Sequence, residues 1–175
     1  EEFVFGKGWS YGAEFLVNKQ KGKFTGWVGY TLSWTWRKFS QLNDGEKFPT
    51  RYDRRHDLSV VTNYDAGKKW KFGAVFIYGT GNAITLPERF YFINGVLTQE
   101  YSKLNQYRMK AYHRLDLSAT YTPMTKKKRK VLGYWVFSIY NAYSRLNPYF
   151  IYFDQDGSAA NGDLKVEAKQ VSLFP

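Results

Sequence analysis

The sequence predicts an all-β chain that forms a segment of an antiparallel transmembrane β-barrel. Three observations carry this prediction. Apolar and polar side chains alternate with a period of two, several alternating segments are longer than ordinary soluble strands, and the connections between them are alternately short and long.

The clearest alternation covers residues 24–37, where one set of positions is aromatic or aliphatic and the other is mostly small and polar. Successive side chains of a strand point to opposite faces, so this strand has one apolar and one polar face. Its length of about 13 residues exceeds the usual 5–6 of soluble strands and suits a tilted membrane strand of about 9–11. By the same pattern we expect seven strands, at 10–19, 24–37, 57–64, 70–80, 113–122, 132–143 and 166–174.

The connections between these strands differ in length in a regular way. Short polar connections are expected at 20–23, 65–69 and 123–131, and long loops at 38–56, 81–112 and 144–165. Long loops without structure of their own are unusual in compact soluble domains. Short turns on one rim and long loops on the other are typical of bacterial outer-membrane barrels, as are aromatic residues at strand ends.

Composition narrows the class further. Aromatic residues make up 20% of the chain, and their apolar bodies and polar tips suit both lipid–water interfaces and sugar-binding surfaces. Mean hydropathy is −0.54 and no run approaches the about 20 apolar residues of a membrane helix. The chain has no cysteine, which excludes disulfides and thiolate metal sites.

The net charge of +11 raises nucleic acid as a partner. The densest basic run, Lys126–Lys130, falls between two predicted strands and is expected to be a solvated turn, so no nucleic-acid partner is expected. The chain starts at Glu1 and ends on Pro175 inside an apolar segment, and we expect it to be part of a longer protein.

Several motifs, in this order, resemble the C-terminal part of TonB-dependent outer-membrane receptors, most closely those of the Bacteroidetes (SusC/RagA-like or related) type. They are YGAE at Tyr11–Glu14, GWVGYT at Gly26–Thr31, FPTRYDRRHDL at Phe48–Leu58, YHRLDLS at Tyr112–Ser118, FSIYNAY at Phe137–Tyr143 and NPY at Asn147–Tyr149. Together they span nearly the whole chain.

The resemblance implies that residues 1–175 belong to a 22-stranded barrel, without its plug domain, its earlier strands and its final strand. It implies an active transporter in the outer membrane of a Gram-negative bacterium, importing an iron chelate, glycan, peptide or vitamin. The implied partners are outer-membrane lipid and lipopolysaccharide, TonB through the plug, and a surface lipoprotein of the kind that some of these receptors use. This chain would supply barrel wall, lumen lining and extracellular loops.

Two groups of loop residues are candidate ligand contacts. Arg51, Tyr52, Arg54 and Arg55 form a cationic cluster, which as an alternative could make salt bridges at a loop–strand junction or meet lipopolysaccharide phosphates. Exposed aromatics could stack on sugars or apolar ligands, or else pack against one another or a lipoprotein. These aromatics are Phe90, Tyr91, Tyr149 and Tyr152. Lumen-facing candidates are Glu14, Thr31, Ser33, Asn63, Asp116, Ser118 and Thr120.

No enzymatic activity is expected. The His56/Asp57 and His113/Asp116 pairs fall on opposite strand faces, so neither forms a base and its orienting partner. The spacing of histidines and carboxylates predicts no metal site, and no cofactor is expected.

Two other functional classes remain open on this sequence. One is a small closed outer-membrane barrel of eight strands with a structural, adhesive or assembly role. The other is a soluble lipocalin-like carrier, which would be soluble without detergent.

Overall fold

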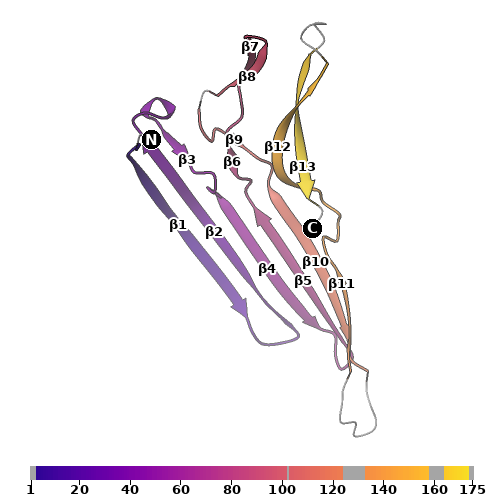
Figure 1. The fold of residues 1–175 in the computed structure, drawn as a ribbon. Helices are drawn as coiled ribbons and strands as arrows, with labels where there is room; N and C mark the ends of the chain where they lie inside the picture. Colours follow the sequence, from indigo (N-terminus) through magenta and orange to yellow (C-terminus); the bar gives the residue numbers. More distant parts are fainter. Residues whose placement is uncertain (1–2, 102, 124–132, 158–163, 174–175) are drawn as a thin grey trace.

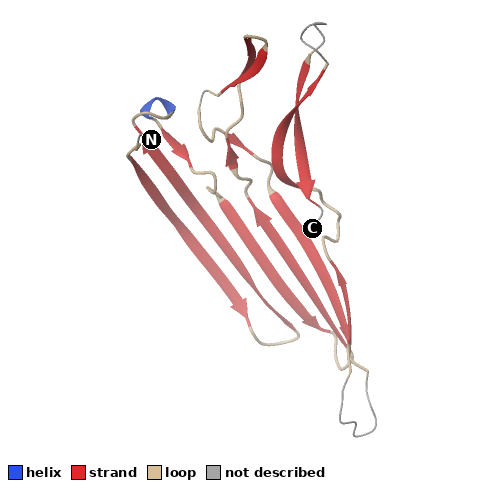
Figure 2. Ribbon diagram, in the orientation of Figure 1, coloured by secondary structure: helices blue, strands red, loops and turns tan. Residues whose placement is uncertain are grey.

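The computed structural model describes residues 3–101, 103–123, 133–157 and 164–173. Within these ranges the chain is all-β, every strand pairing is antiparallel, and there is one 3-10 turn, η1 (Asn43–Gly45), but no α-helix (Figure 2). The predicted antiparallel all-β class is confirmed. In this described part, no helix has the length and apolar character needed to cross a membrane.

Six strands of the described chain form one sheet in which each strand pairs with the next (Figure 1). In spatial order they are β1 (Gly6–Lys19), β2 (Phe24–Phe39), β4 (His56–Asp65), β5 (Trp70–Gly79), β10 (Tyr112–Tyr121) and β11 (Trp135–Ile139). A short strand, β3 (Lys47–Pro49), pairs with the end of β2. Within the described residues this sheet is open, since β1 and β11 each leave one edge unpaired.

The pairing register gathers the apolar positions of all six strands on one face. Tyr30 lies opposite Phe15 on one side and Leu58 on the other, and Leu58 lies opposite Tyr78. A neighbouring row on the same face contains Val60, Phe76 and Leu115, and the next residue of β10 on this face, Leu117, lies opposite Ile139 of β11. We call this the apolar face, and the opposite one the polar face. All seven predicted lumen-facing residues lie on the polar face, with Glu14 opposite Thr31 in the ladder.

Aromatic side chains gather at both ends of the apolar face, and aliphatic ones lie between them. Near the long-loop end, the rings of Tyr11 and Trp34 stack with centroids 5.4 Å apart. Near the short-turn end, Trp70 and Tyr121 lie 4.8 Å apart. Aromatic residues therefore lie at strand ends on both rims, as predicted.

No described part of the chain forms a second layer over the apolar face. Phe15, Val17 and Phe137 are 57–70% exposed, although they sit well inside strands. In the described part of the chain, the buried apolar residues are Phe48, Ala83 and Met109, and none of them lies on the six strands that form the apolar face. Domains normally bury the apolar face of a sheet against another layer, so this face requires an apolar environment from outside the described chain.

At one rim the described connections are short, as predicted. The three long connections at the other rim contain secondary structure of their own. The connections 20–23 and 66–69 are tight turns. In 38–56 the chain forms η1 and β3. In 81–112 it forms two small two-stranded sheets, β6 (Ala83–Ile84) with β9 (Tyr107–Arg108) and, between them in the sequence, the hairpin of β7 (Arg89–Ile93) and β8 (Val96–Glu100). The connection predicted at 144–165 contains a ten-residue strand, β12 (Asn147–Asp156).

Strand β12 pairs with β13 (Lys165–Leu173) in a hairpin beside the main sheet, at the right of Figure 1. The predicted strand at 166–174 is therefore present, apart from Phe174, which lies outside the described residues, as do Lys126–Lys130. The predicted strand at 132–143 is shorter than expected, because β11 ends at Ile139 and Asn141 adopts a positive φ of 51°. Its first residue, 132, also lies outside the described residues.

Gly26 allows the close approach of β2 to β4. Its φ is +148°, and a Cβ placed there would lie 2.0 Å from the Val61 carbonyl oxygen. We predict that Gly26→Ala lowers the free energy of unfolding by about 2 kcal/mol or more, because backbone would have to shift. Urea titration followed by tryptophan fluorescence measures the change.

Gly22→Ala is the matched control. Gly22 also has a positive φ, of +103°, but a Cβ added there would have no atom within 4 Å of it. This substitution should cost only the strain of the backbone, about 1 kcal/mol. Equal costs for the two variants would contradict the close-approach explanation.

Candidate functional site: a cationic and aromatic cavity at the long-loop rim

A cavity of about 620 Å³, which we call the rim cavity, lies where the long connections meet the sheet. It is lined by Arg51, Tyr52, Arg54, Asn82, Tyr112, Tyr140, Asn147, Pro148, Tyr149 and Phe150. Tyr112 shares the polar face, since Gly79 separates it from Asp57 in the same ladder row. The lining combines two guanidinium groups, aromatic rings and amides, and it contains no carboxylate.

The two arginines of the rim cavity differ in their partners. Arg54 lies 3.6 Å from the Asp57 carboxylate, in a pair that is about half exposed. Arg51 has no ion-pair partner among the residues that the structure describes, while its carbonyl accepts a hydrogen bond of 3.2 Å from the Ala83 N–H. Its backbone is thus fixed, and its guanidinium remains able to pair with an anionic ligand.

A β-bulge directs Tyr149 into the rim cavity. The register of β12 against β13 shifts between Pro148 and Phe150, so Tyr149 is an extra residue without a partner across the ladder. Bulges commonly redirect a side chain next to a functional site. The Tyr149 ring meets Phe150 edge-on, with centroids 5.5 Å apart, which holds the two rings at the wall of the cavity.

Arg114 fixes the two tyrosines on the opposite wall. Its guanidinium lies 3.8 Å from the centre of the Tyr140 ring and donates a hydrogen bond to the Tyr112 hydroxyl at 3.2 Å. Asp116 accepts from the same guanidinium at 2.9 Å, and also accepts the Asn141 N–H at 2.9 Å. These bonds hold the aromatic groups of β10 and of the segment after β11 in one arrangement.

Asp53 anchors the loop that carries Arg51, Tyr52 and Arg54. Its side chain is fully buried, and its Oδ1 accepts the Thr35 N–H at 2.7 Å. Its Oδ2 accepts from Arg108 at 2.5 Å and from Arg55 at 3.2 Å. Burial by itself would raise the pKa of the Asp53 carboxyl, but these hydrogen bonds outweigh burial and hold that pKa below its ordinary value.

Arg55, also predicted to contact ligand, does not line the rim cavity. Besides its pair with Asp53, its guanidinium lies 4.8 Å from the ring centre of Trp34 and 5.8 Å from that of Trp36. The Arg55 carbonyl accepts the Ser33 N–H at 3.1 Å. Arg55 therefore supports the loop–strand junction, which is the alternative role considered for this cluster.

The four aromatic residues predicted to contact ligand lie in different places. Tyr149 lines the rim cavity, and Tyr152 lies outside it, 6.0 Å from the Phe150 ring. Phe90 packs against Phe153 at 5.4 Å, and Tyr91 is exposed on the β7–β8 hairpin. The structure thus brings together Arg51, Tyr52, Arg54 and Tyr149 from the eight predicted ligand contacts.

Sequence reasoning misses the remaining wall of the cavity. The predicted bounds place Tyr140 in a strand, and Asn82 and Tyr112 at the two ends of the long connection 81–112, without a role in binding. Asn147 bonds the backbone of His113 at both its N–H and its carbonyl, at 3.0 and 3.1 Å, and so attaches β12 to β10. The signal that could have identified this wall is Asn147, which directly precedes Pro148 and a run of aromatic residues.

The two histidines lie on the apolar face, and Asp57 and Asp116 lie on the polar face, as predicted. The Nδ1 atoms of His56 and His113 are hydrogen-bonded to the hydroxyls of Tyr30 and Tyr143, at 2.7 and 2.8 Å. Each histidine is thus paired with a tyrosine and not with the neighbouring carboxylate.

Comparisons with protein-family models, with characterised proteins and with solved structures give no significant match for this chain. The resemblance to TonB-dependent receptors therefore stays a prediction that rests on the motifs named above.

We predict that Asp53→Asn loosens the long-loop rim by about 3 kcal/mol at neutral pH, because it leaves two guanidinium groups without their shared carboxylate. Hydrogen exchange at the Thr35 amide and across 81–101 measures the change. Asp57→Asn is the control, since its exposed pair with Arg54 contributes less than about 1 kcal/mol.

The same carboxylate predicts a pH dependence. A depressed pKa means that the Asp53 contribution is fully present above the ordinary carboxyl value, about pH 4, and is lost as pH falls through the lower folded value. Exchange in wild type should therefore accelerate below about pH 4 beyond its intrinsic rate, and in Asp53→Asn it should not. Equal acid responses would contradict the anchoring role.

Proposed function

We propose that this chain is part of the wall of an outer-membrane β-barrel of a Gram-negative bacterium, within a TonB-dependent active transporter that imports a nutrient ligand. The observation that carries the membrane part of this proposal is the apolar face. Six strands contribute to it, aromatic rings border it at both ends, and no described layer covers it.

A lipid bilayer supplies the environment that such a face requires. Strands can cross a bilayer when every backbone group is paired and the lipid-facing side chains are apolar. Aromatic side chains with polar tips favour the two interfaces, and aliphatic ones the hydrocarbon between them. Closure of the sheet through further strands at the β1 and β11 edges would remove the unpaired edges.

The transporter part of the proposal rests on the resemblance and is supported by the rim cavity. The cavity lies at the long-loop end, and its lining includes Tyr112 of the polar face, along which ligand entering a lumen would pass. Arg51 offers a charged donor, and Tyr52 and Tyr149 offer aromatic surfaces. Such a lining can bind an iron chelate, a glycan, a peptide or a vitamin without covalent chemistry.

Uptake by whole cells tests this function. Cells that carry the full-length protein are given radiolabelled ferric chelates, vitamins, oligosaccharides and peptides in parallel. We predict that one class accumulates only when both this protein and TonB are present. Arg51→Gln should lower that uptake about tenfold at limiting ligand, since a charged hydrogen bond contributes about 1.5–3 kcal/mol.

Arg37→Gln is the matched control, because Arg37 is exposed on β2 and does not line the rim cavity. Its uptake should equal that of wild type. If loss of the protein changes the uptake of none of these ligand classes, the proposed transporter function is contradicted. Equal uptake by the two arginine variants would contradict the role of the rim cavity.

A further inference from the structure

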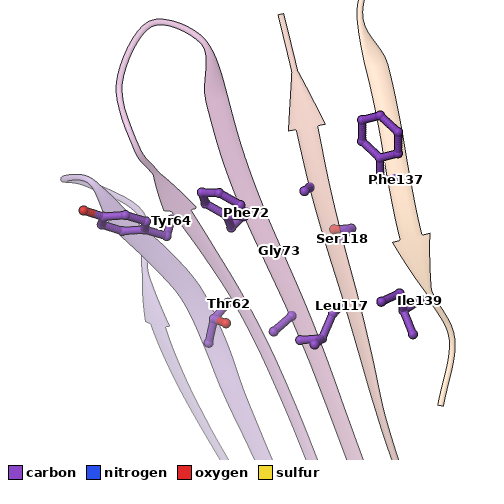
Figure 3. A pocket seen from close by; sticks show the side chains of 10 residues that line it. Thr62, Tyr64, Phe72, Gly73, Leu117, Ser118, Phe137 and Ile139 are labelled. Atoms are coloured by element: carbon purple, nitrogen blue, oxygen red, sulfur yellow. The ribbon is translucent and has the colours of Figure 1, made fainter. Parts of the chain in front are cut away.

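A second hollow lies on the apolar face, at the opposite end of the sheet from the rim cavity. This groove, of about 330 Å³, is formed by β4, β5, β10 and β11 near the short turns (Figure 3). The small residues Thr62, Ala74 and Ala119 form its floor, and Tyr64 and Phe137 stand on either side. Its accessible lining is almost wholly apolar, which suits a hydrocarbon chain.

Aromatic rings lie between the groove and the short turns. Trp70 lies 4.8 Å from Tyr121 and 6.0 Å from Phe72, which itself lines the groove. Trp135 is opposite Tyr121 in the ladder. Rings with an apolar body and a polar tip favour the level of a bilayer where acyl chains meet headgroups.

Exposed lysines gather at the same end of the sheet as these aromatic rings. They are Lys19, Lys21, Lys23, Lys68, Lys69 and Lys71, on or next to the turns 20–23 and 66–69. These two turns contain no acidic residue, and Asp65, the last residue of β4, accepts the Gly67 N–H with its carboxylate at 3.0 Å. None of these lysines forms an ion pair with a described residue, whereas Lys103 and Lys169 at the other rim pair with Glu46 and Asp154.

The turn geometry places two of these lysines just past the aromatic level. The Ala66 N–H donates to the Trp70 carbonyl at 3.1 Å, which closes the turn that holds Lys68 and Lys69. The Asp65 N–H donates to the Lys23 carbonyl at 2.7 Å, which brings the neighbouring turn alongside. Only about 7 Å of strand separates the turn from the row of Tyr64 and Phe72.

We infer that this end of the sheet binds an anionic glycerophospholipid. One acyl chain occupies the groove, the ester region lies at the level of Trp70 and Tyr121, and the phosphate meets Lys23, Lys68 and Lys69. The inference rests on the proposed membrane location. A second copy of the chain fits less well, because two copies in one membrane orientation would bring their lysine turns together.

Native mass spectrometry of the full-length protein tests this site. The protein is equilibrated in mixed micelles that hold phosphatidylglycerol and phosphatidylethanolamine in equal amounts with identical acyl chains. We expect phosphatidylglycerol adducts to exceed phosphatidylethanolamine adducts at least about fivefold, the factor that corresponds to one lysine–headgroup contact. Lys23→Gln/Lys68→Gln/Lys69→Gln should bring the ratio near one, and Ala119→Phe should reduce both adducts.

Two control variants make the same kinds of substitution at other places on the sheet. Lys7→Gln/Lys38→Gln/Lys110→Gln removes three exposed lysines of the long-loop rim, and Ala13→Phe adds a ring to the apolar face at β1. Both should retain the lipid preference of wild type. A wild-type ratio near one, or equal effects of the two lysine triples, would overturn the site. So would a dimer that Ala119→Phe dissociates, since it would show that a second copy occupies the groove.

Membrane insertion is measured on the same samples by heat-modifiable migration and resistance to carbonate extraction. A wild-type protein that is extracted as a soluble species would overturn both this inference and the proposed function. A protein that inserts but shows no lipid preference would overturn the lipid site alone. The Lys23→Gln/Lys68→Gln/Lys69→Gln variant changes only exposed turn residues, so it keeps the test valid if Ala119→Phe fails to insert.

Discussion

Because successive side chains of a strand point to opposite faces, the pairing register from β1 to β11 decides what each face of the sheet carries. A slip of one residue in any ladder would move a whole strand's apolar set to the other face. The observed register has no such slip: Phe15, Tyr30, Leu58 and Tyr78 share one row. The uncovered apolar face, the aromatic borders and the polar lining all follow from this register.

The structure of the long-loop rim does not follow from register alone, because side-chain hydrogen bonds there take the place of backbone hydrogen bonds in the ladder. β2 pairs with β4 as far as Leu32 and with β3 from Trp36 onward. Between them, the Asp53 carboxylate accepts the Thr35 N–H and so continues the ladder across the gap. The same carboxylate holds Arg108, which also donates to the Gly81 carbonyl at 3.0 Å.

Amide side chains attach the other connections in a similar way. Asn43 bonds the Leu104 carbonyl and N–H at 3.1 and 2.8 Å, and Asn105 donates to the Pro49 carbonyl at 3.0 Å. The rim cavity is therefore bounded by loops that are tied to the sheet and to each other. Preorganised walls reduce the ordering cost of binding a ligand.

The long strands and the faces of their side chains can be predicted from the sequence, because apolar and polar residues alternate with a period of two wherever one face of a strand is apolar. The sequence is insufficient for β12, because Pro148 and the run of five ring-bearing or aliphatic residues after it hide the alternation, which a bulge at Tyr149 also interrupts. The two-residue strands β6 and β9 depend on partners 23 or more positions away, which no local pattern reports. Arg55 is grouped with its cationic neighbours by sequence alone, because the burial of Asp53 is not visible there.

The central claim is that the apolar face meets lipid and the polar face meets water. The chain lacks cysteine, so single cysteines can carry nitroxide labels without background. Labels at Leu115→Cys, Leu117→Cys and Ala119→Cys should collide mainly with dissolved oxygen in the bilayer. Those at Ser118→Cys and Thr120→Cys should collide mainly with a water-soluble nickel chelate. Alternation of this kind along β10 is the predicted result, and nickel accessibility at every position would contradict the claim.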